Sequence, residues 1–331
     1  FLGEHIVRRL CERGDEVVVL GRRSYPHLER LGVRCLRGDV RDPAAVIRAV
    51  RGADVVFHAA ALTGVWGRRR DFQSINVGGT KNILAACRKE GVPRLVFTSS
   101  PSVVFGRDDL CGVDESQPSP RRFLAPYPES KAEAERLVLC ADGESLATIA
   151  LRPHLIWGPG DPHLIPRVIE RARRGKLKQV GKGTNRVDLT YIDNAVEAHL
   201  LAADRLAPGS PCAGKAYFIS DGAPVLLWDW INDLLHRLGI PPVRRRVSYR
   251  AAYAAGAVLE TLHGLFLPQR EPPMTRFVAS QLSKSHYFNI KAAKRDFSYR
   301  PIVTPEDGME RLVRWLKEPE ATPEAAGVFR G

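Results

Sequence analysis

FQSINVGGTKNILAACRKEGVPRLVFT, residues 72–98, predicts a helix followed closely by a strand. The helical pattern runs over 72–90, and the short apolar run 94–98 is rich in residues that favour strands. A helix joined to a strand in this way is typical of one repeat of an alternating fold. The stretch therefore predicts the fold class α/β.

The same alternation extends to both sides of this stretch. Helical patterns occupy 43–50, 72–90 and 129–140, and the predicted strands are 16–20, 33–36, 54–58, 94–98 and 146–151. Strands that alternate with helices build a doubly wound, Rossmann-type parallel sheet with helices on both faces. Such a sheet binds ligands at the carboxyl ends of its strands, where the strand order switches.

The ends of the chain and its middle suggest further divisions. FLGEHIVRRLCERG, residues 1–14, reads as a helix with no strand before it, so we expect a chain that begins within a βαβ unit, with the first strand of the sheet missing. Pro and Gly cluster in RPHLIWGPGDPH, residues 152–163, which places a domain change near Pro153. We expect a first domain over 1–153, a smaller α/β substrate-binding lobe over 154–317, and a loose tail over 318–331.

Composition limits the partners and the compartment. The chain has 331 residues, a net charge of +13 and six cysteines without metal-like spacing. Scattered cysteines favour reduced thiols in the cytoplasm. Arginine runs at 68–70, 171–174 and 244–246 carry much of the charge, and solvated helix faces explain them more simply than a nucleic acid does, because no aromatic residues are interleaved with them.

APYPESK, residues 125–131, contains the first candidate for chemistry. Tyr127 and Lys131 are four residues apart, which places both side chains on one face of a helix. They follow the strand 94–98 and the serines Ser99 and Ser100, so all four side chains are expected at the carboxyl edge of the sheet. A second pair with the same spacing, Tyr287 and Lys291, lacks that context, and we interpret Tyr287 as a packing residue.

The proposed chemistry follows from the pKa of a phenol. A free tyrosine has a pKa near 10, and the Lys131 cation is expected to lower the pKa of Tyr127 towards the working range of an acid catalyst. Ser100 is expected to hydrogen-bond the substrate oxygen on which negative charge develops. Each serine has a simpler interpretation as a cap at the end of a strand.

Motifs along most of the chain resemble the extended short-chain dehydrogenases/reductases of the NAD-dependent epimerase/dehydratase superfamily. The matching motifs are Phe1–Gly3, Gly38–Val40, His58–Ala61, Asn76–Thr80, Thr98–Ser100, Tyr127–Lys131, Leu151–Pro153 and Tyr191–Asn194. Within the superfamily, TSSPSVVFG, YPESK and LRPHLIWGPGD resemble the 3β-hydroxysteroid dehydrogenase branch. The nearest resemblance is to bacterial 2-alkyl-3-oxoalkanoate reductases and to sterol-4α-carboxylate 3-dehydrogenases.

The resemblance implies an NAD(P) site in the first domain. The family binds the cofactor pyrophosphate on a glycine-rich turn, of which only the last glycine, Gly3, is present here. Arg22 and Arg23 follow the second strand where NAD-preferring relatives carry an acid, which favours NADP over NAD; a solvated turn is the simpler interpretation of these arginines.

Further cofactor contacts follow from the same resemblance. Asp39 resembles the acid that contacts adenine, and Asn76 resembles an asparagine that supports the active-site helix. The other implied cofactor residues are Val40, Ala59, Ala60, Ala61, Ser99, Pro153 and His154. No His or Cys set has metal-ligand spacing, so we expect no metal.

The segment 249–267, YRAAYAAGAVLETLHGLFL, is the most apolar helical pattern in the chain. Arg250, Glu260 and His263 interrupt it, which argues against a membrane-spanning helix. A lid over the substrate pocket and a peripheral helix at a membrane surface are the two leading interpretations. We also expect a homodimer.

The sequence thus predicts an NAD(P)-dependent oxidoreductase acting on CH–OH groups. It would interconvert a 3-hydroxy and a 3-oxo group on a lipid-like or steroid-like substrate. Two alternatives remain open at this stage: a nucleotide-sugar epimerase or dehydratase on the same fold, and a non-catalytic protein that senses NADP.

Overall fold

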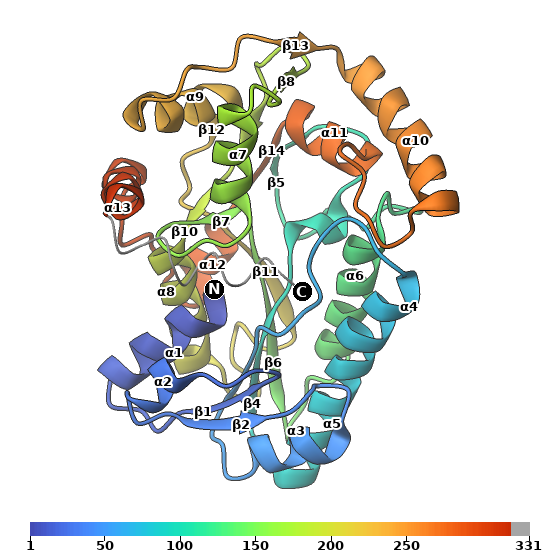
Figure 1. Ribbon diagram of the computed structural model, residues 1–331. Helices are drawn as coiled ribbons and strands as arrows, with labels where there is room; N and C mark the ends of the chain where they lie inside the picture. Colours follow the sequence, from blue (N-terminus) through green and yellow to red (C-terminus); the bar gives the residue numbers. More distant parts are fainter. Residues whose placement is uncertain (319–331) are drawn as a thin grey trace.

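The structure is a computed structural model that describes residues 1–318 and has two lobes (Figure 1). The lower lobe in this view holds the long parallel strands, and the upper lobe holds short strands and several helices. The chain passes between the lobes more than once. The predicted tail, 318–331, lies outside the described residues except for Glu318.

The first part of the chain, up to residue 153, alternates between helices and strands as predicted. Its elements are α1 Leu2–Glu12, β1 Val18–Gly21, α2 Pro26–Glu29, β2 Arg34–Arg37, α3 Pro43–Val50, β3 Val56–His58, α4 Arg69–Phe72, a π-helix Gln73–Gly78, α5 Gly79–Glu90, β4 Arg94–Thr98, a 3₁₀ helix Pro101–Val104, β5 Leu110–Val113, α6 Pro126–Leu139 and β6 Ala147–Pro153.

The second part of the chain contains shorter strands joined by longer connections. Its elements are β7 Ile156–Trp157, α7 Leu164–Arg173, β8 Gln179–Val180, β9 Arg186–Val187, β10 Thr190–Tyr191, α8 Ile192–Arg205, β11 Lys215–Ile219, β12 Val225–Leu226, α9 Leu227–Arg237, β13 Arg246–Val247, α10 Tyr249–Phe266, α11 Arg276–Ser283, β14 His286–Phe288, α12 Lys291–Asp296 and α13 Pro305–Lys317.

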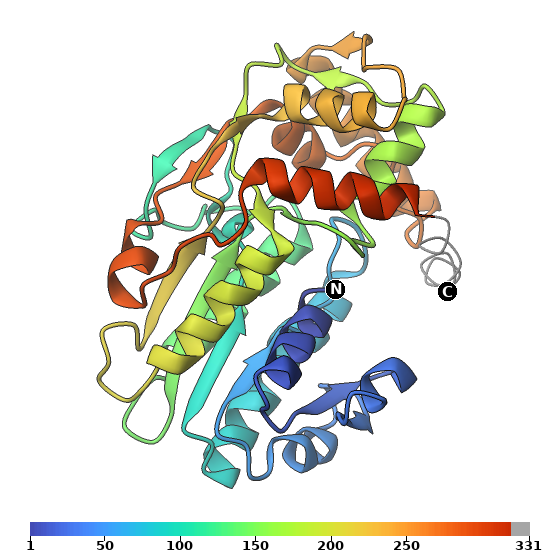
Figure 2. The ribbon, with the colours of Figure 1, turned by 90° about the vertical axis from the view of Figure 1, so that its left-hand side faces the viewer.

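A four-stranded parallel sheet with the order β11-β6-β4-β3 forms the centre of the lower lobe. Its register aligns His58 with Phe97, and Thr98 with Leu151, so these strands end at one edge. Helices α1 and α8 cover one face, and α5 and α6 cover the other (Figures 1 and 2). The predicted α/β fold with a doubly wound parallel sheet is confirmed.

β1 and β2 form a parallel sheet of their own within the described residues. β3 pairs with β4 and is the outer strand of the four-stranded sheet on the side towards β1. Gly38, just after β2, permits close packing here, because a Cβ atom at this position would lie 2.8 Å from Ala45 Cβ and 2.8 Å from Leu20 Cδ1. The expectation of a missing first strand stays a prediction.

The chain returns to this sheet after residue 153. β11 pairs with β6 over the whole length of β11, and α8 packs on β4 and β6. The proposed division at residue 153 stays a prediction, and the sheet draws on residues from both sides of it. The Trp157 ring meets Tyr191 at 5.2 Å and Trp230 at 5.2 Å between centroids, in a hydrophobic cluster that also contains side chains of α1.

Two predicted helices differ in detail from the observed ones. The helix predicted over 129–140 begins earlier, at Pro126, because proline suits the first helical position and Pro126 and Pro128 both lie in the first turn. The helix predicted over 72–90 begins at Arg69 and contains a π-helical turn at 73–78. Such turns are rare in helices and are frequent at functional sites.

Candidate functional site

The predicted site residues gather at the carboxyl edge of the parallel strands. Each group follows directly after a strand: Arg22 and Arg23 after β1, Asp39 and Val40 near the end of β2, Ala59 to Ala61 after β3, Ser99 and Ser100 after β4, and Pro153 and His154 at the end of β6. This edge is where parallel α/β sheets bind their ligands. Tyr127 and Lys131 reach the same edge from α6.

Tyr127 and Lys131 both lie within α6, one helical turn apart. The earlier start of this helix places Tyr127 inside it rather than in the preceding loop. The Lys131 Nζ atom donates a hydrogen bond of 2.6 Å to the carbonyl oxygen of Thr98, the last residue of β4. It also lies 3.9 Å from the centroid of the Phe97 ring. Lys131 therefore ties α6 to the end of β4.

Ser100 is placed to donate a hydrogen bond. It caps the 3₁₀ helix, accepting from the Ser102 amide at 3.2 Å and from the Ser102 hydroxyl at 2.9 Å. Its own hydroxyl proton is then available, and a side-chain hydrogen bond joins Ser100 to Tyr127. Ser99 is buried, and its Oγ atom has no hydrogen-bond partner among residues 1–318.

The pKa of Tyr127 is raised, chiefly because burial disfavours the phenolate, while the hydrogen bond with Ser100 acts in the opposite direction. Burial lowers the pKa of Lys131 to about 7, against the charge of Glu135, which raises it. The prediction of a lowered pKa for Tyr127 is therefore wrong for this structure. A neutral phenol is nevertheless the form that can donate a proton in a reduction.

Asn76 holds the loop after β3 against α6. Its Oδ1 atom accepts from the Leu62 amide at 2.7 Å, and its Nδ2 atom donates to the Leu62 carbonyl at 3.1 Å and to Ser130 Oγ at 2.9 Å. Ser130 in turn donates to the Tyr127 carbonyl at 2.9 Å. Asn76 lies in the π-helical turn, so this turn aims a buried amide at α6.

His58 is a buried neutral side chain in the same region. Thr80 Oγ1 donates to the Asn76 carbonyl at 2.6 Å, so it accepts from His58 Nε2 at 2.9 Å. Burial, and then the charge of Lys131, lower the pKa of His58 to about 3. The Nδ1 atom of His58 has no partner within the described residues.

The residues at the ends of β1 and β2 fit the adenosine half of a dinucleotide. Arg22 and Arg23 are exposed, and Arg22 is close enough to Asp39 to lower the pKa of that carboxyl group. Arg41 has the larger effect, since it holds both oxygens of Asp39 at 3.0 and 2.7 Å and lowers the pKa to about 2. Val40 packs against Gly79 of α5, where a Cβ atom would lie 2.7 Å from Val40 Cγ2.

The first turn of α1 faces the loop after β3. A Cβ atom at Gly3 would lie 3.9 Å from the Cβ atom of Ala59. The amides at a helix N-terminus suit a pyrophosphate group. Together with the Ser100, Tyr127 and Lys131 cluster, these residues fit an NAD(P) molecule laid along the carboxyl edge of the sheet.

Pro153 and His154 lie at the same edge, but the His154 ring contacts protein groups. It is buried and bonded to His286, and Phe105 and Phe288 lie beside it with centroids 5.9 and 5.3 Å away. Its assignment to the cofactor site stays a prediction. Tyr287, which we interpreted as a packing residue, lies in β14, far from α6 in the chain and outside the cluster described above.

Three contributors to the site were not identified from the sequence. Ser130 and Thr80 link Asn76 to α6 and to His58, and His286 binds His154. Ser130 could have been found, because it lies within the motif that holds Tyr127 and Lys131. His286 could not, since 132 positions separate it from His154.

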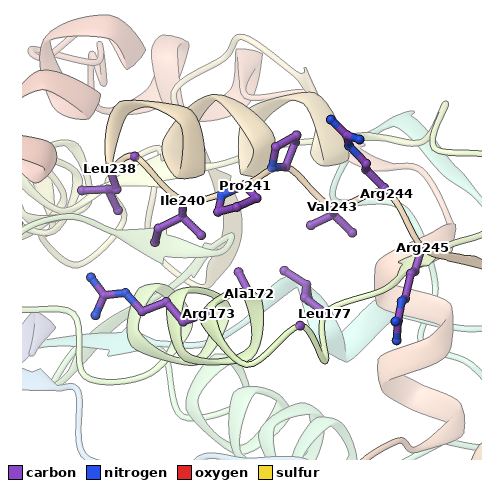
Figure 3. Close-up of a pocket in the computed structure, with 12 residues that line it drawn as sticks. Ala172, Arg173, Leu177, Leu238, Ile240, Pro241, Val243, Arg244 and Arg245 are labelled. Atoms are coloured by element: carbon purple, nitrogen blue, oxygen red, sulfur yellow. The ribbon is translucent and has the colours of Figure 1, made fainter.

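A groove in the upper lobe lies apart from this cluster. Figure 3 shows it between α7 and the segment that follows α9, with a volume of about 880 Å³. Its lining includes Leu177, Ile240 and Val243 as well as Arg244 and Arg245, and contains no predicted site residue. Among residues 1–318 no group of three or more His, Cys, Asp or Glu side chains is arranged to hold a metal ion.

Comparison with known proteins shows the family of this chain. The family model described as the 3-beta hydroxysteroid dehydrogenase/isomerase family matches residues 1–248. A 2-alkyl-3-oxoalkanoate reductase from Stenotrophomonas maltophilia is 50% identical over 94% of this chain and 95% of its own length. A decarboxylating sterol-4-alpha-carboxylate 3-dehydrogenase from Mus musculus is 34% identical over 95% of this chain and 88% of its own.

Solved structures give the same architecture. A dTDP-glucose 4,6-dehydratase from Streptomyces venezuelae with NAD bound superimposes with a TM-score of 0.74 and 26% identity, covering 98% of this chain and 96% of that one. These comparisons confirm the expected class of reaction: an NAD(P)-dependent oxidoreductase that interconverts 3-hydroxy and 3-oxo groups on lipid-like substrates. The chain belongs to the 3-beta hydroxysteroid dehydrogenase/isomerase family.

Proposed function

We propose that this chain uses NADPH to reduce the 3-oxo group of a 2-alkyl-3-oxoalkanoate. The observation that carries the proposal is the cluster of Ser100, Tyr127 and Lys131 at the carboxyl edge of β4, in a chain half identical to a reductase of that name. A raised pKa keeps Tyr127 protonated, as the acid in a reduction must be.

The chain's own residues act on the carbonyl oxygen of the substrate. Bound NADPH supplies the hydride that reduces the carbonyl carbon. Ser100 can turn its hydroxyl proton from Tyr127 to the oxygen as that atom gains negative charge, because Ser102 donates to Ser100 and leaves this proton to be donated. Tyr127 then transfers its phenolic proton to that oxygen, and Lys131 stabilises the phenolate that remains.

The preference for NADP rests on the exposed guanidinium groups after β1. Arg22 and Arg23 occupy the end of that strand, beside the Asp39–Arg41 pair. A guanidinium group binds a 2′-phosphate with two parallel hydrogen bonds, whereas an unphosphorylated ribose gains little from it. NAD remains the alternative cofactor within the family.

α10 serves as a lid of the substrate pocket in this proposal. Its Gly256 allows close packing on the start of α11, since a Cβ atom there would lie 2.7 Å from the Thr275 carbonyl carbon. The residues after α10 reach the loop that follows β3, because Trp66 Nε1 donates to the Pro268 carbonyl at 3.1 Å. Arg69, the first residue of α4, pairs with Glu129 of α6, two residues from Tyr127.

The outer face of α10 also supports peripheral contact with a membrane. Val258, Leu262, Leu265 and Phe266 are exposed by 59%, 46%, 70% and 74%, so this face is unusually apolar. No helix among residues 1–318 has both the length and the apolar character needed to span a bilayer. Binding to vesicles of phosphatidylglycerol that is lost in Leu265→Glu, but kept in Leu31→Glu on another surface, is the expected result.

Cytoplasmic location and homodimer formation complete the proposal. The six cysteines are all free, as suits a reducing compartment. A shallow depression between α5 and α6, lined by Leu84, Ala85 and Leu137, offers an outer surface for a second copy. Light scattering on the purified protein measures its mass, and a monomer at micromolar concentration would contradict the dimer.

The experiment that tests the proposed function follows NADPH oxidation with a long-chain 2-alkyl-3-oxo acid. Tyr127→Phe is expected to lower kcat by roughly 10²–10⁴-fold, the usual contribution of a general acid, and to leave NADPH binding intact. Tyr287→Phe is the matched control, because it removes a hydroxyl from a second tyrosine that also precedes a lysine by four residues. It should retain wild-type activity.

The outcomes separate the alternatives. Turnover that persists in Tyr127→Phe would contradict the assigned acid. Tight NADPH binding without turnover of the oxo acid would point to a nucleotide-sugar substrate or to a non-catalytic sensor of NADP. Turnover of nucleotide sugars tested in parallel distinguishes these two.

A further inference from the structure

α6 contacts the sheet through three side chains spaced one turn apart. Tyr127 meets Ser100, Lys131 meets the Thr98 carbonyl, and the third side chain, Glu135, meets Arg152 of β6. Residues four apart lie one above another on a helix, and four residues advance by about 6 Å. The Glu135–Arg152 contact therefore completes a row whose first two members form the proposed catalytic pair.

Glu135 and Arg152 form a buried, two-pronged ion pair. Arg152 Nε lies 2.9 Å from Glu135 Oε2, and Arg152 Nη2 lies 2.6 Å from Glu135 Oε1. The side chains are only 8% and 7% exposed. A planar guanidinium group that meets a carboxylate with two parallel bonds fixes both distance and orientation.

Stability alone does not explain this pair. Burying two charges costs desolvation energy, and the attraction between the charges often does no more than offset that cost. Replacing such a pair with apolar residues of similar volume is therefore frequently neutral or stabilising. The third nitrogen of the group, Arg152 Nη1, is buried without a partner within residues 1–318. An unsatisfied buried donor typically costs about 1–3 kcal/mol.

A ring contact and the pairing of its strand also hold Arg152 in place. Its guanidinium carbon lies 5.0 Å from the centroid of the Phe218 ring, and Phe218 is its direct partner in the register of β11 with β6. Its neighbour Leu151 pairs with Thr98, whose carbonyl receives the Lys131 hydrogen bond. The Lys131 and Glu135 contacts together thus fix the position of α6 along β4 and β6.

We propose that Glu135 and Arg152 act as positioning residues for Lys131 and Tyr127. This inference rests on the proposed function, because it concerns the same proton transfer. Arg152 holds the carboxylate at a defined height on α6, and the carboxylate holds Lys131 in its charged form at the end of β4. The effect of Glu135 on Lys131 agrees with its charge, since this charge raises the pKa of Lys131 against the effect of burial.

The other groups around Lys131 do not supply that negative charge. From β4 it faces the Thr98 carbonyl and the Phe97 ring, from β3 it faces neutral His58, and on its own helix Tyr127 is protonated. Glu135 is the carboxylate that acts on its pKa. Removing that charge should lower the pKa of Lys131 below about 7.

Two substitutions separate charge from geometry. Glu135→Gln keeps the shape and removes the charge, so kcat should fall by roughly tenfold, and the loss of activity on raising the pH should begin at lower pH. Arg152→Lys keeps the charge and loses the two-pronged contact, so kcat should fall without that pH shift, because Lys131 keeps its carboxylate. Neither should change KM for NADPH.

Glu90→Gln is the matched control. Glu90 pairs with Arg51 at 3.0 Å at the end of α5, on the side of the sheet away from the site, so this variant should retain wild-type kcat and pH profile. The double variant Glu135→Met/Arg152→Met removes the pair without leaving a lone charge. It should fold with nearly wild-type stability and still show the low kcat.

A readout without cofactor completes the test. NMR of ¹⁵N-lysine, with Lys131→Met for assignment, should show the Lys131 pKa lowered in Glu135→Gln and unchanged in Glu90→Gln. Wild-type kcat and an unchanged Lys131 pKa in the folded double variant would overturn the positioning role. Should Glu135→Gln and the double variant fail to fold, Glu135→Asp, which shortens the side chain and keeps the charge, should lower kcat. Wild-type kcat in Glu135→Asp would overturn the role equally.

The same assay distinguishes failure of the proposed function from failure of the positioning role. A wild-type protein without turnover of any 3-oxo acid would remove the proposed function. A wild-type protein that turns over while the Glu135 and Arg152 variants match it would remove only the positioning role.

Discussion

The Nε2 atom of His154 lies 2.7 Å from the Nδ1 atom of His286, and both side chains are almost fully buried. His286 Nε2 donates to the Gln281 carbonyl at 2.9 Å, so its Nδ1 atom accepts and His154 Nε2 donates. This bond joins the end of β6, in the parallel sheet, to β14. Both rings are neutral, because burial lowers the pKa of His154 well below its usual value and that of His286 to about 4.

The histidine pair predicts acid sensitivity. Because the folded pKa values lie below the unfolded value near 6.5, the unfolded chain binds more protons as the pH falls, and the free energy of unfolding decreases below about pH 6.5. His286→Phe should lower the free energy of unfolding by about 1–3 kcal/mol near pH 7, since it leaves the His154 donor unpaired. His154→Phe/His286→Phe should recover part of that loss and flatten the pH dependence.

Urea unfolding near pH 7 and near pH 5 measures both effects. His236→Gln, an exposed histidine on α9, is the control and should match the wild type at both pH values. A double variant that keeps the wild-type decrease between the two pH values would show that other groups cause it.

Lys131 predicts a pH dependence of the same sign in a higher pH range. Its folded pKa of about 7 lies below the usual value near 10.5, so the unfolded state binds more protons between these values. The contribution of this group to the free energy of unfolding therefore rises with pH above about 7, by up to about 1.4 kcal/mol per pH unit. Lys131→Met should remove that rise, and denaturant unfolding near pH 7 and near pH 9 compares the two proteins. Parallel curves would mean that Lys131 is not buried in a charge-disfavouring environment.

Asn76→Ala should damage both stability and turnover. Three hydrogen bonds to Leu62 and Ser130 are lost, and the buried partners are left unsatisfied, so we expect a loss of about 1–3 kcal/mol in the free energy of unfolding. Tyr127 is held through Ser130, so kcat should fall more than KM changes. Asn82→Ala removes a single bond to the Val40 carbonyl and should lose less stability and little kcat. Equal kcat in the two variants would contradict the supporting role of Asn76.

Arg22→Ala tests the choice of cofactor. Loss of a charge-assisted contact to a 2′-phosphate should raise KM for NADPH by roughly tenfold or more and leave KM for NADH nearly unchanged. Arg30→Ala, an exposed arginine just after α2, controls for net charge. Steady-state kinetics with both cofactors measures these KM values. Equal effects on NADPH and NADH would show that Arg22 is a solvated side chain that does not contact the 2′-phosphate.

Much of the fold follows from local patterns. The strand 94–98 and the helix 43–50 were predicted with their observed bounds, and the strands 16–20, 33–36, 54–58 and 146–151 within about two residues, whereas β5 was not predicted. Short β-branched runs between amphipathic helices favour one architecture strongly, so the parallel sheet and its binding edge were also predictable. Tyr127 and Lys131 were found because their spacing, the preceding strand and the serines all lie close together in the sequence.

Other features depend on contacts between distant positions. The π-helical turn at 73–78 forms where Asn76 meets Leu62 and Ser130, and no local preference distinguishes it from an ordinary helix. The pKa of Tyr127 rises instead of falling because burial, a property of the packed lobes, outweighs what residue spacing suggested.

The amino-acid sequence by itself determined the α/β class, the edge that holds the site and the Ser100, Tyr127 and Lys131 set, because hydrophobic periodicity and short-range motifs encode them. Only the tertiary structure decided the charge state of those residues and the partners that hold them, Arg152 for Glu135 and His286 for His154. The physical reason is that desolvation and hydrogen-bond geometry depend on which distant segments exclude water from one another.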